Sequence, residues 1–329
     1  MSPPWPTGAK TRAAILSVVM LLWGPGCTLF NINLGPRLAP FQETVISGEG
    51  PNKVLLLDID GVIGDGKKRA IAGIPAELGM VEKIREMLLR AEKDEELKAI
   101  WLRINSPGGT VTSSDMIYHD LKVFKNKKKA RVYVSFMDLA ASGGYYIAMA
   151  GDKIVAHPTS LTGSIGVIAL KVNLQGLLEK VGVDFEVVKS GDKKDFLSPL
   201  RPFTEEERKM FQETIDNFHR RFVDVIAENR PGLDRETVQK LADGRVFTAQ
   251  QALEAKLVDR IAYLDETADF IKSDLGIPNV KVVAYQRPGD YKTNLYSSMP
   301  QAPAINLVNI DLDFLPQTSA PYFMYLWMP

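Results

Sequence analysis

Short apolar runs alternate with helical patterns from residue 54 to residue 285, and this alternation constrains the fold more than any other feature of the chain. Thr204 and Glu207 form a capping-box pattern at the start of the longest helical segment. We predict strands at 54–60, 99–104, 132–136, 153–157, 185–189 and 281–285, and helices at 76–91, 113–124, from Ser142, near 173–180 and at 204–229. An α/β fold with a largely parallel sheet, covered by helices on both faces, follows from this order.

The first 30 residues are typical of a segment that directs a chain to a membrane. Lys10 and Arg12 precede an apolar run, 13–30, which a Gly-Pro-Gly break interrupts just before Cys27. The run is only marginally long for a span of about 20 residues, so an uncleaved anchor and a cleaved signal peptide both stay open. A lipid on Cys27 is a further alternative, although the leucine expected three residues before a lipidated cysteine is missing.

Changes in composition divide the rest of the chain. Residues 31–52 are rich in glycine, proline and polar residues and are interpreted as a linker, and residues 53–286 as the folded domain. Residues 287–329 form an apolar C-terminal extension that ends in Phe-Met-Tyr-Leu-Trp-Met-Pro. This ending is too apolar for a free tail, so we expect it to dock on its own fold or on a neighbouring molecule.

Charge and metal-ligand content argue against several kinds of partner. The 40 basic and 40 acidic side chains cancel, and the longest basic run is Lys-Asn-Lys-Lys-Lys at 125–129, so no nucleic-acid partner is expected. A single cysteine allows no internal disulfide, and His119, His157 and His219 do not have the spacing of metal ligands. We expect no metal, nucleotide or organic cofactor.

One strand carries a motif of a different enzyme class. Leu-Leu-Leu-Asp-Ile-Asp-Gly-Val-Ile, which contains Asp58 and Asp60, matches the first motif of haloacid-dehalogenase-like phosphatases. Those enzymes need a second acidic pair, spaced Gly-Asp-x-x-x-Asp, to hold Mg²⁺. The Gly-Asp pairs that begin at Gly151, Gly191 and Gly289 lack the second acid at this spacing. We therefore interpret Asp58 and Asp60 as strand-end and turn residues, and the phosphatase stays a minor alternative.

Two glycine-bearing turns after apolar strands could build a nucleophilic site. They are Ile-Asn-Ser-Pro-Gly-Gly-Thr at 104–110 and Ala-Ser-Gly-Gly-Tyr-Tyr at 141–146. Ser142, at a helix start, would expose its hydroxyl beside the N–H of Gly143, while Gly108 and Gly109 would let the backbone approach a ligand closely and present N–H groups. The pattern offers a nucleophile with two oxyanion donors, although small residues that merely permit close packing would give the same pattern.

The base that would remove the serine proton is not fixed by the residues alone. None of the three histidines has a partner aspartate that the sequence identifies. A lysine can act as the base if burial lowers its pKa from about 10.4 to about 7 or 8. Lys189, Lys193 and Lys194 all lie in Val-Lys-Ser-Gly-Asp-Lys-Lys-Asp-Phe-Leu-Ser-Pro, and all three stay open on this argument.

Five motifs in order carry a resemblance to a known family. Ile-Asn-Ser-Pro-Gly-Gly, Met-Asp-Leu-Ala-Ala-Ser-Gly-Gly-Tyr-Tyr, Ser-Leu-Thr-Gly-Ser-Ile-Gly, Lys-Ser-Gly-Asp-Lys-Lys-Asp-Phe-Leu-Ser-Pro and Leu-Ala-Asp-Gly-Arg-Val-Phe-Thr resemble the signal peptide peptidase A family of Ser/Lys proteases over residues 53–286. The resemblance implies a Clp protease/crotonase-like fold of repeated β-β-α units with a helical C-terminal arm.

The resemblance also implies the roles of single residues. Ser142 would be the nucleophile and Lys194 the general base, with Ser164 hydrogen-bonded to the lysine. The N–H groups of Gly109 and Gly143 would form the oxyanion hole.

One Ser-Gly-Gly and one Lys-Asp-Phe-Leu-Ser-Pro match the short, single-copy form of the family. This form implies a homo-oligomeric ring of about eight subunits, in which serine and lysine meet across a subunit boundary. We expect a serine endopeptidase on the extracytoplasmic side of a bacterial cytoplasmic membrane that degrades apolar peptides such as signal-peptide remnants. A non-catalytic membrane scaffold of the same fold is the second alternative.

Overall fold

The computed structural model describes residues 39–64, 78–287, 292–297 and 323–328. The predicted membrane segment, including Cys27, and most of the predicted linker lie outside these residues. No helix in the described ranges is both long and apolar enough to cross a membrane.

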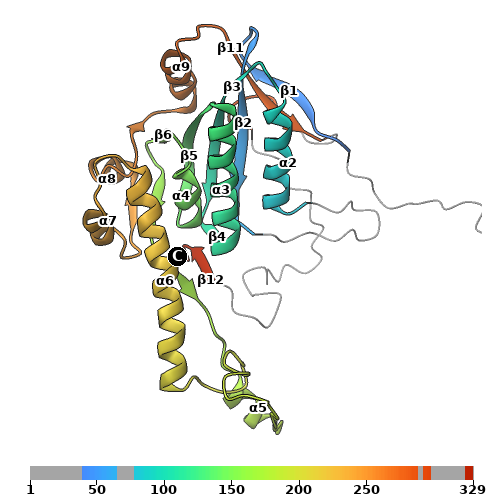
Figure 1. Ribbon diagram of the computed structural model, residues 1–329, viewed down its shortest axis with the longest axis vertical. Helices are drawn as coiled ribbons and strands as arrows, with labels where there is room; N and C mark the ends of the chain where they lie inside the picture. The colour runs from blue at the N-terminus through green and yellow to red at the C-terminus, as the bar shows by residue number, and fades with distance from the viewer. Residues whose placement is uncertain (1–38, 65–77, 288–291, 298–322, 329) are drawn as a thin grey trace, which may run out of the picture. The chain divides into compact units, whose positions relative to one another are not determined.

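A nine-stranded sheet forms the centre of the described fold (Figure 1). Its parallel strands, in spatial order, are β11 (Val280–Gln286), β2 (Asn52–Asp60), β3 (Leu97–Ser106), β5 (Arg131–Ala141), β6 (Lys153–Ala156) and β10 (Arg260–Ile261). The strand β1 (Gln42–Ser47) is antiparallel to β11 at one edge. In addition to β6, β5 pairs in parallel with β7 (Leu161–Gly163). The strand β7 is in turn antiparallel to β9 (Val246–Thr248). The predicted largely parallel sheet is confirmed.

Helices cover both faces of the sheet because the strand residues alternate between two apolar clusters. Leu55 and Leu57 face a cluster that α2 (Met80–Glu92), α3 (Val111–Lys128), α4 (Gly143–Ala148) and α6 (Glu205–Asn229) complete. Leu56 and Trp101 face the opposite side, where α9 (Leu264–Leu275) packs. Burial on both sides explains why the strands read as continuous apolar runs. The short helices α7 (Arg235–Leu241) and α8 (Ala249–Glu254) follow α6.

The start of α6 is fixed as the capping-box pattern predicts. The Thr204 hydroxyl accepts from the Glu207 N–H, and the Glu207 carboxylate accepts from the Thr204 N–H. Before this cap, residues 170–204 form an arm that contains α5 (Gln175–Lys180) and extends to the start of α6 (Figure 1).

The strand predicted at 185–189 is wrong. Residues 183–189 form no regular secondary structure, and Phe185, Val187 and Val188 are 54%, 49% and 93% exposed. A β-branched run becomes a strand only when a neighbouring strand bonds its N–H and C=O groups. No strand of the described part pairs with this segment.

A second sheet of three short strands holds the end of the chain. Its order is β4 (Gly108–Thr110), β12 (Phe323–Leu326) and β8 (Ile168–Ala169), and β12 is antiparallel to both neighbours. The described end of the apolar extension therefore docks on the chain's own fold, which is one of the two alternatives expected from its composition.

Candidate active site

Ser142 lies at the sharp turn between β5 and α4. Its backbone has φ 52° and ψ −113°, a region that residues other than glycine rarely adopt. Two backbone hydrogen bonds hold the turn, because Ser142 N–H donates to Gly163 O at 2.7 Å and Ser142 O accepts from Tyr146 N–H at 2.8 Å. The side chain is buried, and Oγ has no hydrogen-bond partner among the described residues. The turn thus presents a hydroxyl that the surrounding fold leaves unsatisfied.

The N–H groups of Gly109 and Gly143 lie beside this turn. On one edge of β4, Ile63 N–H donates to Gly108 O at 2.8 Å and Thr110 N–H donates to Ile63 O at 2.9 Å. In a parallel pairing the residue between these two contacts directs its own N–H to the opposite edge, so the Gly109 N–H faces β12. A Cβ built on Gly143 would lie 3.1 Å from the Gly109 nitrogen. The two predicted oxyanion donors are therefore neighbours.

Both positions require glycine for steric reasons. A Cβ on Gly109 would lie 1.8 Å from Ile63 O, and one on Gly143 would lie 2.5 Å from Ser114 Oγ. The Ser114 hydroxyl is itself fixed, because it donates to Thr110 O at 2.9 Å. Gly109 permits the close approach of Ile63 to β4, and Gly143 permits the close approach of Ser114 on α3 to the Ser142 turn.

Ser164 lies next to Ser142 through strand pairing. Ala141 of β5 pairs with Gly163 of β7, and the two serines directly follow these residues. Ser164 also has a positive φ of 48°, and its N–H donates to Arg245 O at 2.8 Å. Its side chain lines a cavity of about 550 Å³, together with residues of α6 and of the C-terminal segment that follows β12, among them Asp216, His219 and Trp327. The fold brings together Ser142, Ser164, Gly109 and Gly143.

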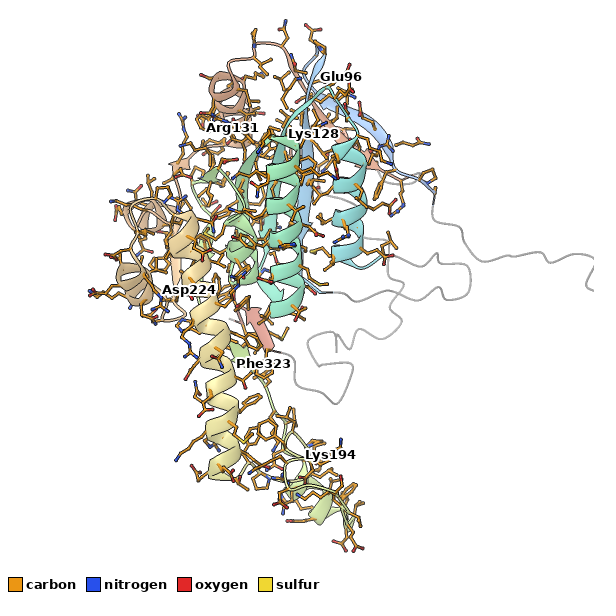
Figure 2. All side chains as sticks on the ribbon, viewed as in Figure 1. Glu96, Lys128, Arg131, Lys194, Asp224 and Phe323 are labelled. Atoms are coloured by element: carbon orange, nitrogen blue, oxygen red, sulfur yellow. The ribbon has the colours of Figure 1, made fainter. Side chains whose placement is uncertain are left out.

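Lys194 is not part of this group within one chain. It lies on the arm, where its side chain is exposed, and Figure 2 shows it well separated from Phe323 of β12. Lys193 forms an ion pair with Glu206 at 2.6 Å, and Lys189 forms one with Asp195 at 2.7 Å. In the described ranges no ion pair or hydrogen bond involves the Lys194 ammonium, so among the three candidates it alone has no carboxylate partner.

Charged contacts anchor the segment that carries Lys194. Asp195 accepts from Arg201 Nε at 2.8 Å and Nη2 at 2.9 Å, and Arg201 also donates to Glu207 at 2.6 and 2.8 Å. Arg201, and then Lys189, hold the pKa of Asp195 well below its usual range. Arg201 and the Thr204 N–H lower the pKa of Glu207 to about 2. The arm is therefore tied to the first turn of α6 by groups that stay charged at neutral pH.

The histidines lie away from the Ser142 turn's hydroxyl. His119 is exposed on α3, His157 contacts the hydroxyl of Thr159 at 2.9 Å, and His219 contacts Ala242 O at 2.9 Å. None of them contacts Ser142, whose hydroxyl has no partner in the part of the chain that the structure describes.

Asp58 of the phosphatase-like motif forms ion pairs with two cationic side chains. Arg103 donates to its two oxygens at 2.8 and 3.1 Å, and Lys292 forms a close ion pair with it. Both cations are buried. Partial desolvation and the neighbouring Asp58 raise the pKa of Asp60, whose side chain still reaches solvent at the strand end. Within the described residues no group of three or more histidine, cysteine or acidic side chains could hold a metal ion. Asp58, which is half-buried, serves here as the counter-charge of two buried cations.

Comparison with known proteins identifies the family. The model of peptidase family S49 matches residues 124–277, and the Clp protease model matches residues 67–162. A putative signal peptide peptidase SppA of Enterococcus faecium is 37% identical over 245 residues, which is 74% of this chain and 70% of that protein.

The chain belongs to peptidase family S49. Membership confirms the resemblance to signal peptide peptidase A, and the Clp protease match agrees with the observed sheet. A putative protease of Synechocystis sp., slr0021, is 40% identical over 230 residues, 70% of this chain and 77% of that protein. Protease 4 of Haemophilus influenzae is 30% identical over 219 residues, 67% of this chain and 34% of that protein.

Sequence reasoning missed the aromatic lining of the candidate site. Tyr146 on α4 and Phe222 on α6 are fully buried beside the Ser142 turn, and Tyr325 of β12 packs against both. Tyr146 follows Ser142 by four residues, which places it one helical turn along α4. The position of Tyr325 depends on a pairing between distant segments that no local pattern encodes.

Proposed function

We propose that the chain is a serine endopeptidase in which Ser142 attacks the peptide carbonyl. The observation that supports this proposal is the buried Ser142 hydroxyl, which has no hydrogen-bond partner among the described residues. It lies on a strained turn beside the N–H groups of Gly109 and Gly143. Backbone strain of this kind clusters at reactive sites. Membership of the S49 family supports the reaction class.

The proposed reaction needs four groups of this chain. Ser142 Oγ bonds to the substrate carbonyl carbon while its proton passes to Lys194 Nζ, and the N–H groups of Gly109 and Gly143 stabilise the negative oxygen. The lysine then gives the proton to the leaving amine. Water, deprotonated by the same lysine, hydrolyses the acyl-serine ester and restores the hydroxyl.

Lys194 is proposed to come from a neighbouring copy of the chain. The lysine is exposed on the arm, and Ser142 is buried in the body of the fold. A lysine acts as a base only in its neutral form, which a site closed to water favours. The cavity beside Ser164, once a neighbouring copy covers it, would offer such a site to an entering ammonium group, and the Ser164 hydroxyl would orient it.

The surface of the arm supports association of copies. Apolar side chains gather there and are 42–93% exposed: Leu170, Val172, Leu177, Val181, Val183, Phe185, Val187 and Val188. Apolar surface of this extent is typical of a contact between proteins. A closed homo-oligomeric ring, of about eight copies as the family resemblance implies, would cover every arm.

We further propose that the substrates are apolar peptides, including remnants of signal peptides, and that residues 1–30 hold the enzyme at the outer side of the cytoplasmic membrane. The aromatic lining of the cleft suits apolar side chains. The apolar run at 13–30 supports the membrane attachment.

Cleavage of an apolar fluorogenic peptide by the detergent-solubilised chain tests this function. Ser142→Ala and Lys194→Ala should each lose activity, Lys193→Ala should keep it, and EDTA should have no effect. A mixture of Ser142→Ala and Lys194→Ala, assembled together, should regain part of the activity because some boundaries then hold an intact pair. Full activity of Ser142→Ala would refute the mechanism, and inactivity of the assembled parent would favour the scaffold.

A further inference from the structure

The chain turns a corner between the two sheets directly before the predicted oxyanion donor Gly109. Strand β3 ends at Ser106 and β4 begins at Gly108, with one proline between them. Ser106 is fully buried, and its hydroxyl bridges the corner because it accepts from the Gly108 N–H at 3.1 Å. A serine side chain that bonds the backbone two residues ahead stabilises a turn of this kind. The Ser106 hydroxyl therefore fixes how β4 leaves the corner.

The same hydroxyl joins the corner to the turn at residues 61–63, which is the end of the phosphatase-like motif. Ser106 Oγ donates to Gly61 O at 2.6 Å, and the Gly61 N–H donates to Asn105 O at 2.9 Å. Gly61 has φ 75°, a backbone conformation that favours glycine. Two hydrogen bonds thus connect this turn to the last residues of β3, so the motif supports the corner in this fold.

The turn at residues 61–63 holds β4 on both sides of Gly109. Ile63 N–H donates to Gly108 O at 2.8 Å, and Thr110 N–H donates to Ile63 O at 2.9 Å. The contact is close, because a Cβ built on Gly109 would lie 1.8 Å from Ile63 O. Since Gly108 and Thr110 are both held, the direction of the Gly109 N–H between them is fixed.

The corner also contacts the helix that carries the second predicted donor. A Cβ built on Gly144 of α4 would lie 3.2 Å from Ser106 O and 3.5 Å from Ser106 Cβ. Gly143, whose N–H is the second donor, directly precedes Gly144. A shift of the Ser106 corner would therefore change the separation of the two donors, which must both lie about 3 Å from the developing oxyanion.

We propose that Ser106 is a positioning residue of the oxyanion hole. Its hydroxyl, through Gly61 and Gly108, keeps the Gly109 N–H where the developing negative oxygen requires it. The proposal rests on the proposed peptidase function. Ser106 acts through other groups, since its hydroxyl bonds to the backbone of the chain itself. Because a displacement of about 1 Å in a catalytic group can cost about 100-fold in rate, loss of this hydroxyl should weaken the transition state and leave peptide binding unchanged.

Steady-state hydrolysis of the apolar fluorogenic peptide by the full-length, assembled Ser106→Ala variant tests the proposal. The kcat should fall by about 10- to 100-fold, and KM should stay within about 2-fold of the parent. Ser135→Ala is the matched control, because Ser135 is also buried and accepts from Trp101 Nε1–H at 2.7 Å on the opposite face of the sheet. It should lower the urea midpoint, as Ser106→Ala does, but should leave kcat within about 2-fold.

A peptide aldehyde and the corresponding peptide alcohol separate the oxyanion from the rest of the peptide. Ser142 Oγ adds to the aldehyde carbon, the serine proton passes to Lys194, and the former carbonyl oxygen takes the negative charge at the two N–H donors. The alcohol cannot form this adduct. In Ser106→Ala the Ki of the aldehyde should rise by about the factor by which kcat falls, whereas the Ki of the alcohol should stay within about 2-fold.

Ser106→Cys replaces the alanine variant if circular dichroism shows that Ser106→Ala does not fold. A thiol forms weaker hydrogen bonds than a hydroxyl, so the same changes in kcat and in the aldehyde Ki should appear with a smaller amplitude. An unchanged kcat, or equal rises of the Ki values of the aldehyde and the alcohol, would overturn the proposal.

Hydrogen exchange of residues 104–112, followed by mass spectrometry, decides the role of Ser106 even if the chain hydrolyses no peptide. In Ser106→Ala the Gly108 N–H loses its acceptor, so this segment should exchange about 10-fold faster, and in Ser135→Ala its exchange should not change. Equal exchange in the two variants would refute the positioning role whatever the activity. Faster exchange together with hydrolysis that does not need Ser142 would instead keep this role and remove the peptidase mechanism.

Discussion

Ser142 and Ser164 stand side by side at the ends of two paired strands, and both have a positive φ. The Ser142 N–H donates to the carbonyl of Gly163, the residue before Ser164, at 2.7 Å. The sheet holds both serines in their strained backbone conformations, because β5 and β7 end together and each chain must turn sharply to leave the sheet. The same bond joins the Ser142 turn to the segment whose next residue, Ser164, lines the cavity.

The backbone strain at Ser142 predicts that glycine is a more stable substitution than alanine at this position, the reverse of their order in a helix. Ser142→Gly should have a free energy of unfolding about 1 kcal/mol higher than Ser142→Ala, and therefore a higher unfolding temperature. The reason is that glycine accepts φ 52° without a Cβ penalty. Both variants should lose peptide hydrolysis by at least about 10³-fold. Thermal denaturation followed by circular dichroism measures the first effect. Alanine and glycine at Val123, an exposed position in the interior of α3, should show the opposite order of stability, because glycine weakens a helix interior relative to alanine.

The buried cluster around Asp58 predicts a structural role for a residue of the phosphatase-like motif. Asp58→Ala leaves the buried cations Arg103 and Lys292 without a counter-charge, so it should lower the free energy of unfolding by about 3–5 kcal/mol. Asp60→Ala, at the exposed strand end, should change it by about 1 kcal/mol or less. Urea denaturation of the two variants measures the difference, and equal midpoints would contradict this role.

The contacts of Arg201 predict an effect on activity through the position of Lys194. Arg201→Gln removes the cation that joins Asp195 to Glu207, so the arm segment loses its anchor to α6. We expect peptide hydrolysis to fall by about 10- to 100-fold, the size of effect that a displaced catalytic group produces. Arg208→Gln, whose pair with Glu205 is exposed and 4.0 Å long, is the matched control and should stay within about 2-fold of the parent. Similar rates for the two variants would contradict the anchoring role.

The same network predicts how the arm responds to acid. The pKa values of Asp195 and Glu207 are depressed in the folded chain, to about 2 for Glu207. Carboxylates with depressed pKa values stabilise the fold above their unfolded pKa of about 4, and the contribution disappears as the pH falls through the folded value. Hydrogen-exchange protection of residues 189–207 should therefore be constant from about pH 7 to about pH 5 and fall between about pH 4 and pH 2. In Arg201→Gln the loss should begin at a higher pH.

The exposed arm predicts a single substitution that separates the copies. Val188 is 93% exposed on the apolar surface that we propose as the contact. Val188→Asp should give a smaller species in light scattering and should reduce peptide hydrolysis, because a buried charge opposes association. Val45→Asp changes an exposed valine, 54% accessible, on the edge strand β1, which lies away from the arm (Figure 1). It should leave both the mass and the rate unchanged, and a parent that is already monomeric would remove the basis of this prediction.

Local sequence was sufficient for most of the central sheet and for the turn that carries Ser142. The strands at 54–60, 99–104 and 132–136 form because their runs are buried on both faces, a condition that composition already expresses. The start of α6 follows Thr204 because a capping box satisfies backbone groups within four residues. The segment 185–189 has the same composition as a strand, and it fails because the described chain supplies no edge for it to pair with.

The sequence by itself determined the family, the alternation of strands and helices, and the placement of Ser142 and two glycines at strand ends, because each of these depends on neighbours within a few residues. Only the tertiary structure decided that β12 pairs with β4 and that Asp58 is neutralised by Arg103 and Lys292. These features depend on contacts between segments far apart in the chain, whose pairing is set by complementary edges, burial and charge in the folded state. The sequence pattern indicates which segments could make such contacts, but packing in the folded state determines which of them form.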